Sequence, residues 1–146
     1  MKIIVDIDNT LSLSDERFQF ATKENGKIDW DVVHSNENVI KDKPNYPMID
    51  LVRRYKKDNV EIIIITGRPE SCKKGTELWL QNYNIPYDKL YMRSEKYHYI
   101  KANILKKKIF EEFINDKVFC AYDDDDSVIQ TWLDLGIPCF KVITIQ

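Results

Sequence analysis

The chain has 146 residues, a formal net charge of −2 and 43% hydrophobic residues. This length fits one domain with an apolar core of its own. The net charge gives no general basic footprint for a nucleic-acid duplex, although it leaves room for a local basic patch around an active site. The three cysteines have no CxxC or Cys/His spacing, so neither a disulfide framework nor a zinc site is expected.

Strands and helices are expected to alternate along the chain, which predicts a parallel β-sheet with helices on both faces. Runs of β-branched residues predict the strands, and amphipathic segments bounded by Gly, Pro or Asn predict the helices. The expected strands are 3–7, 60–65, 90–92, 118–122 and 139–143. The expected helices are 13–24, 31–34, 47–58, 69–83, 97–114 and 127–135, with 27–45 otherwise irregular.

Nothing in the pattern indicates a membrane or a targeting segment. The first strand is expected from Ile3, which leaves no room for a signal peptide. No apolar run approaches the ~20 residues that span a bilayer. We therefore expect a cytoplasmic protein without a membrane contact, and the sequence leaves its oligomeric state open.

Two carboxylates lie at the end of the first expected strand: Asp6 is within Ile3–Ile7, and Asp8 follows it together with Asn9 and Thr10. Open α/β sheets bind their ligands at the carboxyl ends of the strands. Two acids held there are costly unless a cation or a reaction requires them. Taken alone, the pair could equally be a solvated pair of acids in a turn.

Polar residues recur at the ends of two later strands. Thr66, Gly67 and Arg68 follow the strand at 60–65, and Asp123 and Asp124 follow the strand at 118–122. A lysine, Lys101, lies on the helix expected between them. Aspartates, a threonine, a lysine and an acidic pair in this order resemble the haloacid dehalogenase (HAD) superfamily of aspartyl phosphatases.

Chemistry gives these residues roles within that resemblance. Asp6 can attack phosphorus as a nucleophile, and Asp8 can act as general acid and then as general base. Mg²⁺ suits the carboxylates of Asp6, Asp123 and Asp124, and the resemblance adds the Asp8 backbone carbonyl. Asp125 and Asp126 are expected at the cap and first turn of the last helix.

The phosphate itself is expected to lie near the second and third motifs. Thr66, Gly67 and Arg68 precede a helix N-terminus that favours phosphate. Lys101 is expected to balance the phosphoryl charge, whereas the run Lys106–Lys108 is interpreted as a solvated helix face.

Further segments of the chain form a second pattern: Asp29-Trp30, Asp42-Lys43-Pro44-Asn45, Leu90-Tyr91-Met92-Arg93, and Tyr122-Asp123-Asp124 with Trp132, Gly136 and Cys139. They carry a closer resemblance, over about residues 1–142, to the 3′-phosphatase domain of bacteriophage polynucleotide kinase. It implies that Arg17 and Arg93 bind substrate, and we expect them at the rim of the site with Arg68 and Lys96. The chain departs from that family at Asn9, Tyr97-His98 and Asp125.

The resemblance implies an α/β fold, a Rossmann-like three-layer sandwich with a parallel sheet, in one domain over 1–146. A small helical cap insert at about 12–45 would leave the site open to a nucleic-acid end. The expected function is a Mg²⁺-dependent phosphomonoesterase that removes 3′-phosphates from polynucleotides or nucleotides. A 5′-nucleotidase or small-metabolite phosphatase is the nearest alternative, and a receiver-type phosphoacceptor or a silent binding module is further away.

Overall fold

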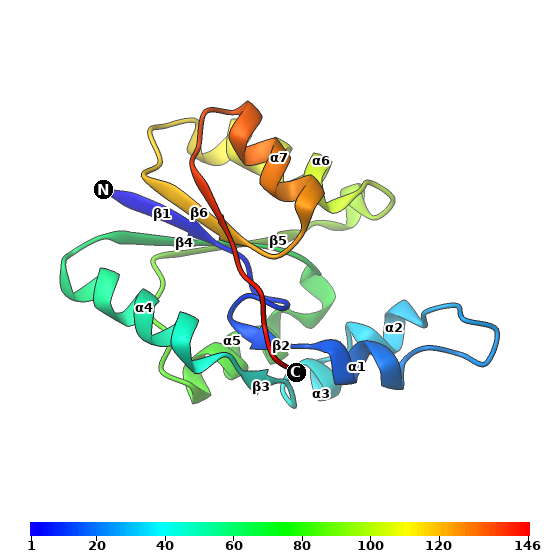
Figure 1. Ribbon diagram of the computed structural model, residues 1–146. Helices are drawn as coiled ribbons and strands as arrows, with labels where there is room; N and C mark the ends of the chain where they lie inside the picture. The colour runs from blue at the N-terminus through cyan, green and yellow to red at the C-terminus, as the bar shows by residue number, and fades with distance from the viewer.

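The computed structural model describes residues 1–146 and has a five-stranded sheet at its centre (Figure 1). The central strand β1 (Lys2–Val5) lies between β4 (Glu61–Pro69) and β6 (Cys120–Asp123). The edge strands are β5 (Lys89–Arg93) beside β4 and β7 (Cys139–Lys141) beside β6. Every pairing is parallel, which confirms the predicted fold class.

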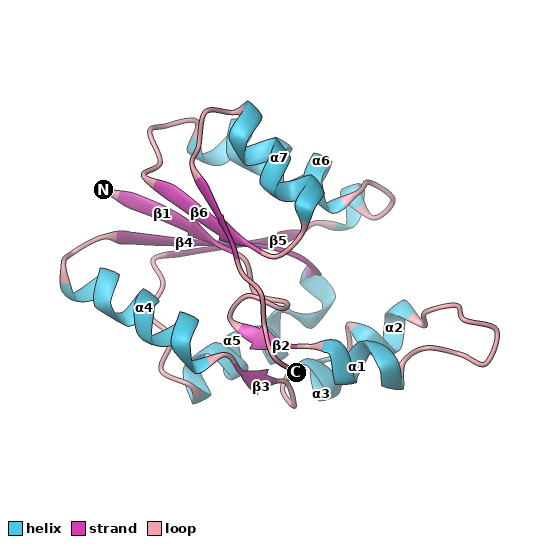
Figure 2. Ribbon diagram, viewed as in Figure 1, coloured by secondary structure: helices cyan, strands magenta, loops and turns pink.

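Helices cover both faces of this sheet, as Figure 2 shows. The helices α4 (Tyr46–Lys57) and α5 (Lys73–Asn82) pack on one face. On the other face lie α6 (Ala102–Ile109), continued by a π-helical turn (Phe110–Ile114), and α7 (Asp126–Asp134). Because both faces are covered, the middle of each central strand is a continuous apolar run and does not alternate.

The core is divided by the sheet into two halves. Ile3 and Val5 of β1 point toward α4 and α5, whereas Ile4 between them points toward α6 and α7. The indole of Trp132 is fully buried in the second half. None of the helices combines the length and the apolar character that a membrane crossing would need.

An insert leaves the core between β1 and α4. It starts at β2 (Ser12–Leu13) and returns at β3 (Lys43–Pro44), which pair as a small antiparallel sheet. Between them lie α1 (Asp15–Phe20), α2 (Trp30–Val33) and α3 (Asn36–Val39). Figure 1 shows α1 and α2 projecting away from the helices that cover the sheet. The two strands and α3 were not predicted. Elements of two residues (β2, β3) or four residues (α3) are too short to show a periodic pattern in the sequence.

Gly75 lets the insert approach the core. Its backbone N–H donates to Asn36 Oδ1 at 2.7 Å, which joins α5 to α3. A Cβ at position 75 would lie 2.7 Å from the carbonyl oxygen of Asn36 and 2.8 Å from Val39 Cγ2. A side chain would therefore push α3 away from α5, and only glycine permits this contact.

Two predicted helices are shorter in the structure. The helix predicted at 13–24 spans only 15–20, because Ser12 and Leu13 belong to β2 and Thr22 pairs with Ile28 across a turn. The helix predicted from residue 97 begins at Ala102, after a short 3₁₀ turn (Glu95–Tyr97). The second difference decides which lysine reaches the site.

Candidate active site

The deepest part of the site is a buried cluster of charges at the carboxyl ends of β1 and β6. Asp6 directly follows β1 and Asp123 ends β6, and these strands are neighbours. The Lys106 ammonium donates to both carboxylates, at 2.8 Å to Asp6 and 2.6 Å to Asp123. Thr10 donates to the other Asp6 oxygen at 3.2 Å. All four side chains are buried, so this is a preorganised set of charges and not a solvated acidic turn.

The lysine of this cluster is Lys106, which corrects the assignment to Lys101. Lys101 is exposed and is the N-cap residue of α6, whereas Lys106 is only 3% exposed. Because α6 begins at Ala102, position 106 lies beside Leu105 on the face packed against the sheet. Positions 102, 105, 106 and 109 follow the spacing of a buried helix face. A lysine at one of these buried positions was the feature of the sequence that could have identified Lys106 as the lysine of the site.

Three carboxylates in this cluster can share a cation. Oxygens of Asp6, Asp123 and Asp124 all lie within 4.8 Å of one another. Burial raises the pKa of Asp6; the charge of Lys106 opposes this, and the charge of Asp123 adds to it. Burial and the charge of Asp123 raise the pKa of Asp124 to about 6. One lysine thus balances the cluster incompletely, and an oxygen-only donor set of this kind suits Mg²⁺.

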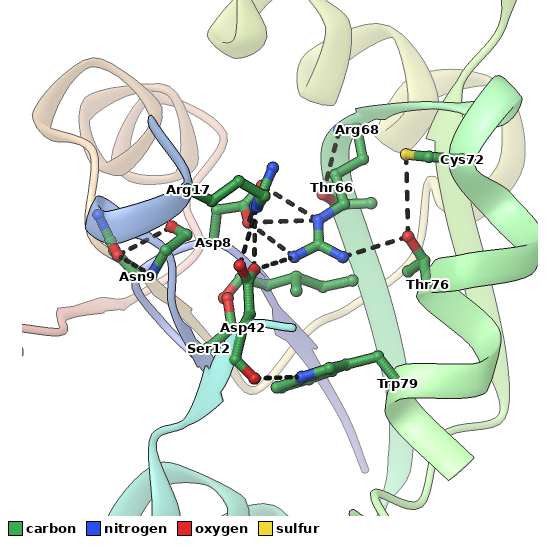
Figure 3. A network of polar contacts seen from close by, with 12 residues as sticks. Asp8, Asn9, Ser12, Arg17, Asp42, Thr66, Arg68, Cys72, Thr76 and Trp79 are labelled. Carbon is green, nitrogen blue, oxygen red and sulfur yellow. Dashed lines mark hydrogen bonds and ion pairs between the residues drawn. The ribbon is translucent and has the colours of Figure 1, made fainter. Parts of the chain in front are cut away.

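Asp8 belongs to a second, separate cluster, shown in Figure 3. Its carboxylate accepts hydrogen bonds from Arg68, at 2.8 Å from Nη2 and 3.2 Å from Nε, and from Arg17 Nη2. Burial alone would raise the pKa of Asp8, but the charges of Arg68 and Arg17 hold it well below its usual range. The Asp8 side chain lies outside the group that can share a cation, so the two acids of the first motif serve different clusters.

Asp42 completes the second cluster, and the site prediction did not include it. It accepts from Arg17 Nε at 2.9 Å and from Arg68 Nη2 at 2.9 Å, so two acids and two arginines alternate. Its backbone carbonyl accepts from the indole of Trp79 at 2.8 Å (Figure 3). Asp42 comes from the turn that leads into β3 and is 4% exposed. The only signal in the sequence was its place in a segment that resembles the phage family.

The predicted rim of arginines is not observed. Arg68 and Arg17 are buried, because Asp8 and Asp42 draw their guanidinium groups inward. Arg93 is half-buried, and its guanidinium donates to the backbone carbonyls of Gly67 at 3.0 Å, Tyr97 at 2.8 Å and Ile100 at 2.6 Å. Arg93 therefore ties the loop before α6 to the C-terminal part of β4.

The C-terminal part of β4 holds the predicted phosphate-binding residues, because the strand continues to Pro69 and does not end at residue 65 as predicted. Thr66 is fully buried, and its hydroxyl accepts from the backbone N–H of Arg68 at 3.1 Å. Gly67 lies between them, with ordinary van der Waals space where a Cβ would project. The pairing of β4 with β5 is irregular between Ile65 and Pro69, which bends this segment at the edge of the site.

Two local expectations can be compared with the backbone. Asn9 adopts a left-handed φ of 57°, which asparagine tolerates almost as well as the glycine usual in the family. The side-chain oxygen of Asn9 accepts a hydrogen bond from the backbone N–H of Ser14. Ser14 is the N-cap residue of α1, but its own side chain does not cap that helix. Asp125 caps α7 as predicted, accepting from the N–H groups of Ser127 at 2.8 Å and Val128 at 3.2 Å.

Comparison with known proteins gives consistent matches. Residues 1–144 match the family model of the polynucleotide kinase PNKP phosphatase domain. Over 140 residues the chain is 29% identical to a protein of Autographa californica nuclear polyhedrosis virus assigned as a bifunctional polynucleotide kinase/RNA ligase. The match covers 93% of this chain but 18% of the viral protein.

Two solved structures resemble it in three dimensions. A chain of the Pnkp1/Rnl/Hen1 RNA repair complex is 31% identical with a TM-score of 0.78, over 97% of this chain and 42% of that one. D,D-heptose 1,7-bisphosphate phosphatase from B. bronchiseptica, complexed with magnesium and phosphate, is 12% identical with a TM-score of 0.60, over 97% and 80% of the two chains. At that identity the second likeness concerns the fold alone.

Proposed function

The chain belongs to the family of polynucleotide kinase phosphatase domains, and on this premise we propose that it is a Mg²⁺-dependent phosphomonoesterase that removes the terminal 3′-phosphate of a polynucleotide. The observation that carries the proposal is that the two acids of the first motif, Asp6 and Asp8, belong to two different clusters of charged side chains. Asp6 stands in an acidic cluster with one lysine, and Asp8 stands between two arginines. A phosphoryl group between them would meet a nucleophile on one side and cations on the other.

In the first step an oxygen of Asp6 attacks phosphorus, and the bond from phosphorus to the sugar oxygen breaks. The leaving oxygen takes a proton from Asp8, which requires the protonated form of that carboxyl. In the second step water attacks the aspartyl-phosphate, Asp8 takes the proton of the water, and inorganic phosphate leaves with Asp6 restored. The arginine partners of Asp8 favour its ionised form, which the second step needs. The first step therefore requires Asp8 to take up a proton from solvent, against the charge of these arginines, before the sugar oxygen leaves.

The other residues position and neutralise charge. Asp6, Asp123 and Asp124, with the Asp8 backbone carbonyl, would hold Mg²⁺, which would neutralise charge on the phosphoryl oxygens. Lys106 holds the nucleophile Asp6 in place through its hydrogen bond.

The phosphate-binding groups are assigned to the second motif and its neighbour. The hydroxyl of Thr66 and the backbone N–H of Gly67 would donate to the phosphoryl oxygens. The guanidinium groups of Arg68 and Arg17 supply positive charge beside Asp8.

The test is a substrate comparison with purified protein. A 3′-phosphorylated oligonucleotide should be hydrolysed faster than the matching 5′-phosphorylated oligonucleotide and the 3′-mononucleotide, and only with Mg²⁺. The Asp6→Asn variant, which keeps the shape of the side chain but removes the attacking oxygen, should lose turnover on every substrate while remaining folded. Equal hydrolysis of mononucleotides would overturn the polynucleotide proposal in favour of a nucleotidase, and normal turnover by Asp6→Asn would overturn the aspartyl-phosphate mechanism.

A further inference from the structure

The insert carries a cluster of aromatic rings that its own packing does not cover. The rings of Trp30 and His34 stack, with centroids 5.6 Å apart and an interplanar angle of 24°. Phe18 meets the edge of Trp30 at 6.2 Å. Trp30 remains 55% exposed, an unusual position for the largest aromatic side chain.

Trp30 is not among the buried residues of the insert. Helix α2 is capped by Asp29, whose side chain accepts from the N–H of Val32 at 3.3 Å. The insert buries Ala21, Val33 and Val39 instead. A ring that served packing would be expected among those residues and not at the surface.

The ring cluster lies one side chain away from Asp8. Arg17 joins them, because its guanidinium donates to Asp8 and, at 2.7 Å, to the backbone carbonyl of Val33, the residue before His34. The same guanidinium lies 5.2 Å from the centroid of the Phe18 ring. The rings therefore border the side of the site on which Asp8 would meet the leaving group.

The imidazole of His34 is a neutral ring under ordinary conditions. Burial lowers its pKa to about 4; the charge of Asp8 opposes this, and the charges of Arg17 and Arg68 reinforce it. A neutral imidazole stacked on an indole offers a flat surface and no charge, which is the kind of surface on which nucleobases stack.

We propose that the His34–Trp30 pair is the stacking platform for the base of the terminal nucleotide, the one that carries the 3′-phosphate. The proposal rests on the function proposed above and adds to it a source of selectivity. A sugar phosphate or an aryl phosphate has no base to place on these rings. Stacking tolerates every base, so the platform would favour nucleic-acid ends without selecting their sequence.

The first test compares a short 3′-phosphorylated oligonucleotide with the same oligonucleotide whose last sugar lacks its base. In the unmodified protein kcat/KM should be about tenfold higher for the end that has a base, the effect of one base–aromatic stack. Trp30→Ala and His34→Ala should remove most of this advantage, and Trp30→Phe should retain it. Hydrolysis of the abasic end, which measures any general damage to the site, should change little.

Two variants serve as controls. Phe20→Ala removes an aromatic ring that is 75% exposed on α1 but outside the cluster, and the advantage of the base should survive it. Tyr99 is 95% exposed on the loop before α6. If Tyr99→Ala, and not Trp30→Ala, removes the advantage, the base lies elsewhere and the platform is refuted.

The second test is binding, without turnover. Trp79 and Trp132 are fully buried, so Trp30 is the only one of the three tryptophans that solvent and ligand can reach directly. Titration of the 3′-phosphorylated oligonucleotide into Asp6→Asn should quench the fluorescence, and the abasic oligonucleotide should not. Hydrolysis of both ends at equal rates, with no quenching, overturns the platform but leaves the 3′-phosphatase intact. Hydrolysis of p-nitrophenyl phosphate without hydrolysis of either oligonucleotide overturns the proposed function instead.

Discussion

Replacing Lys106 by Met keeps the length of the side chain but removes its charge, which would leave Asp6 and Asp123 buried beside each other without a cation. Both carboxylates are at most 5% exposed, and each loses a hydrogen bond shorter than 3 Å. Removing one partner of a buried ion pair costs about 3–5 kcal/mol of unfolding free energy. We expect a loss of this size in metal-free buffer, measured by urea denaturation.

Two features of this variant distinguish its physical cause from general damage to the core. Mg²⁺ should restore part of the lost stability, because a cation among the three acids replaces the missing charge. In the Asp6→Asn background, the same Lys106→Met change should lower the unfolding free energy by at least about 1.5 kcal/mol less than in the unmodified protein, because one of the two carboxylates is already neutral. Turnover should fall by roughly a hundredfold or more, as for the loss of one charge-stabilising group.

The matched control is Lys101→Met, five positions earlier at the exposed N-cap of α6. It should change the unfolding free energy by less than about 0.5 kcal/mol and leave turnover close to normal. Loss of activity in Lys101→Met with normal behaviour of Lys106→Met would refute the arrangement described above. Equal effects of Lys106→Met with and without the Asp6→Asn change would refute the electrostatic cause.

Three further outcomes are expected. Asp8→Asn should slow hydrolysis of a 3′-phosphorylated oligonucleotide far more than that of p-nitrophenyl phosphate, because an alkoxide needs a proton to leave and an activated phenolate does not; equal losses on the two substrates would argue against the general acid. Chelation by EDTA should abolish turnover and Mg²⁺ should restore it, whereas the Asp123→Ala, Asp124→Ala double variant should stay inactive at any practical Mg²⁺ concentration; activity after exhaustive chelation would remove the metal from the mechanism. Gly75→Ala should lower the unfolding free energy by about 1–3 kcal/mol, the typical cost of overpacking, because its Cβ would meet the carbonyl of Asn36, and an unchanged denaturation midpoint would show that α3 can move without cost.

The sequence by itself determined the parallel sheet and the presence of acids at the carboxyl ends of its strands. Each central strand is a run of β-branched residues, and both faces of such a strand must be covered. The carboxyl ends of β1 and β6 then bring Asp6 and Asp123 together, whatever the details of the helices. The cap at Asp125 was also predictable, because an N-cap depends only on residues two and three positions away.

Only the tertiary structure decided which cations meet those acids. The choice of Lys106 over Lys101 depends on the residue at which α6 begins, and a shift of a few residues turns a different face toward the sheet. Arg17 and Arg68 were predicted at the rim of the site, because their buried partner Asp42 lies 25 and 26 positions away. Long-range pairing of this kind leaves no local pattern, and it converted an expected rim of arginines into a buried network around Asp8.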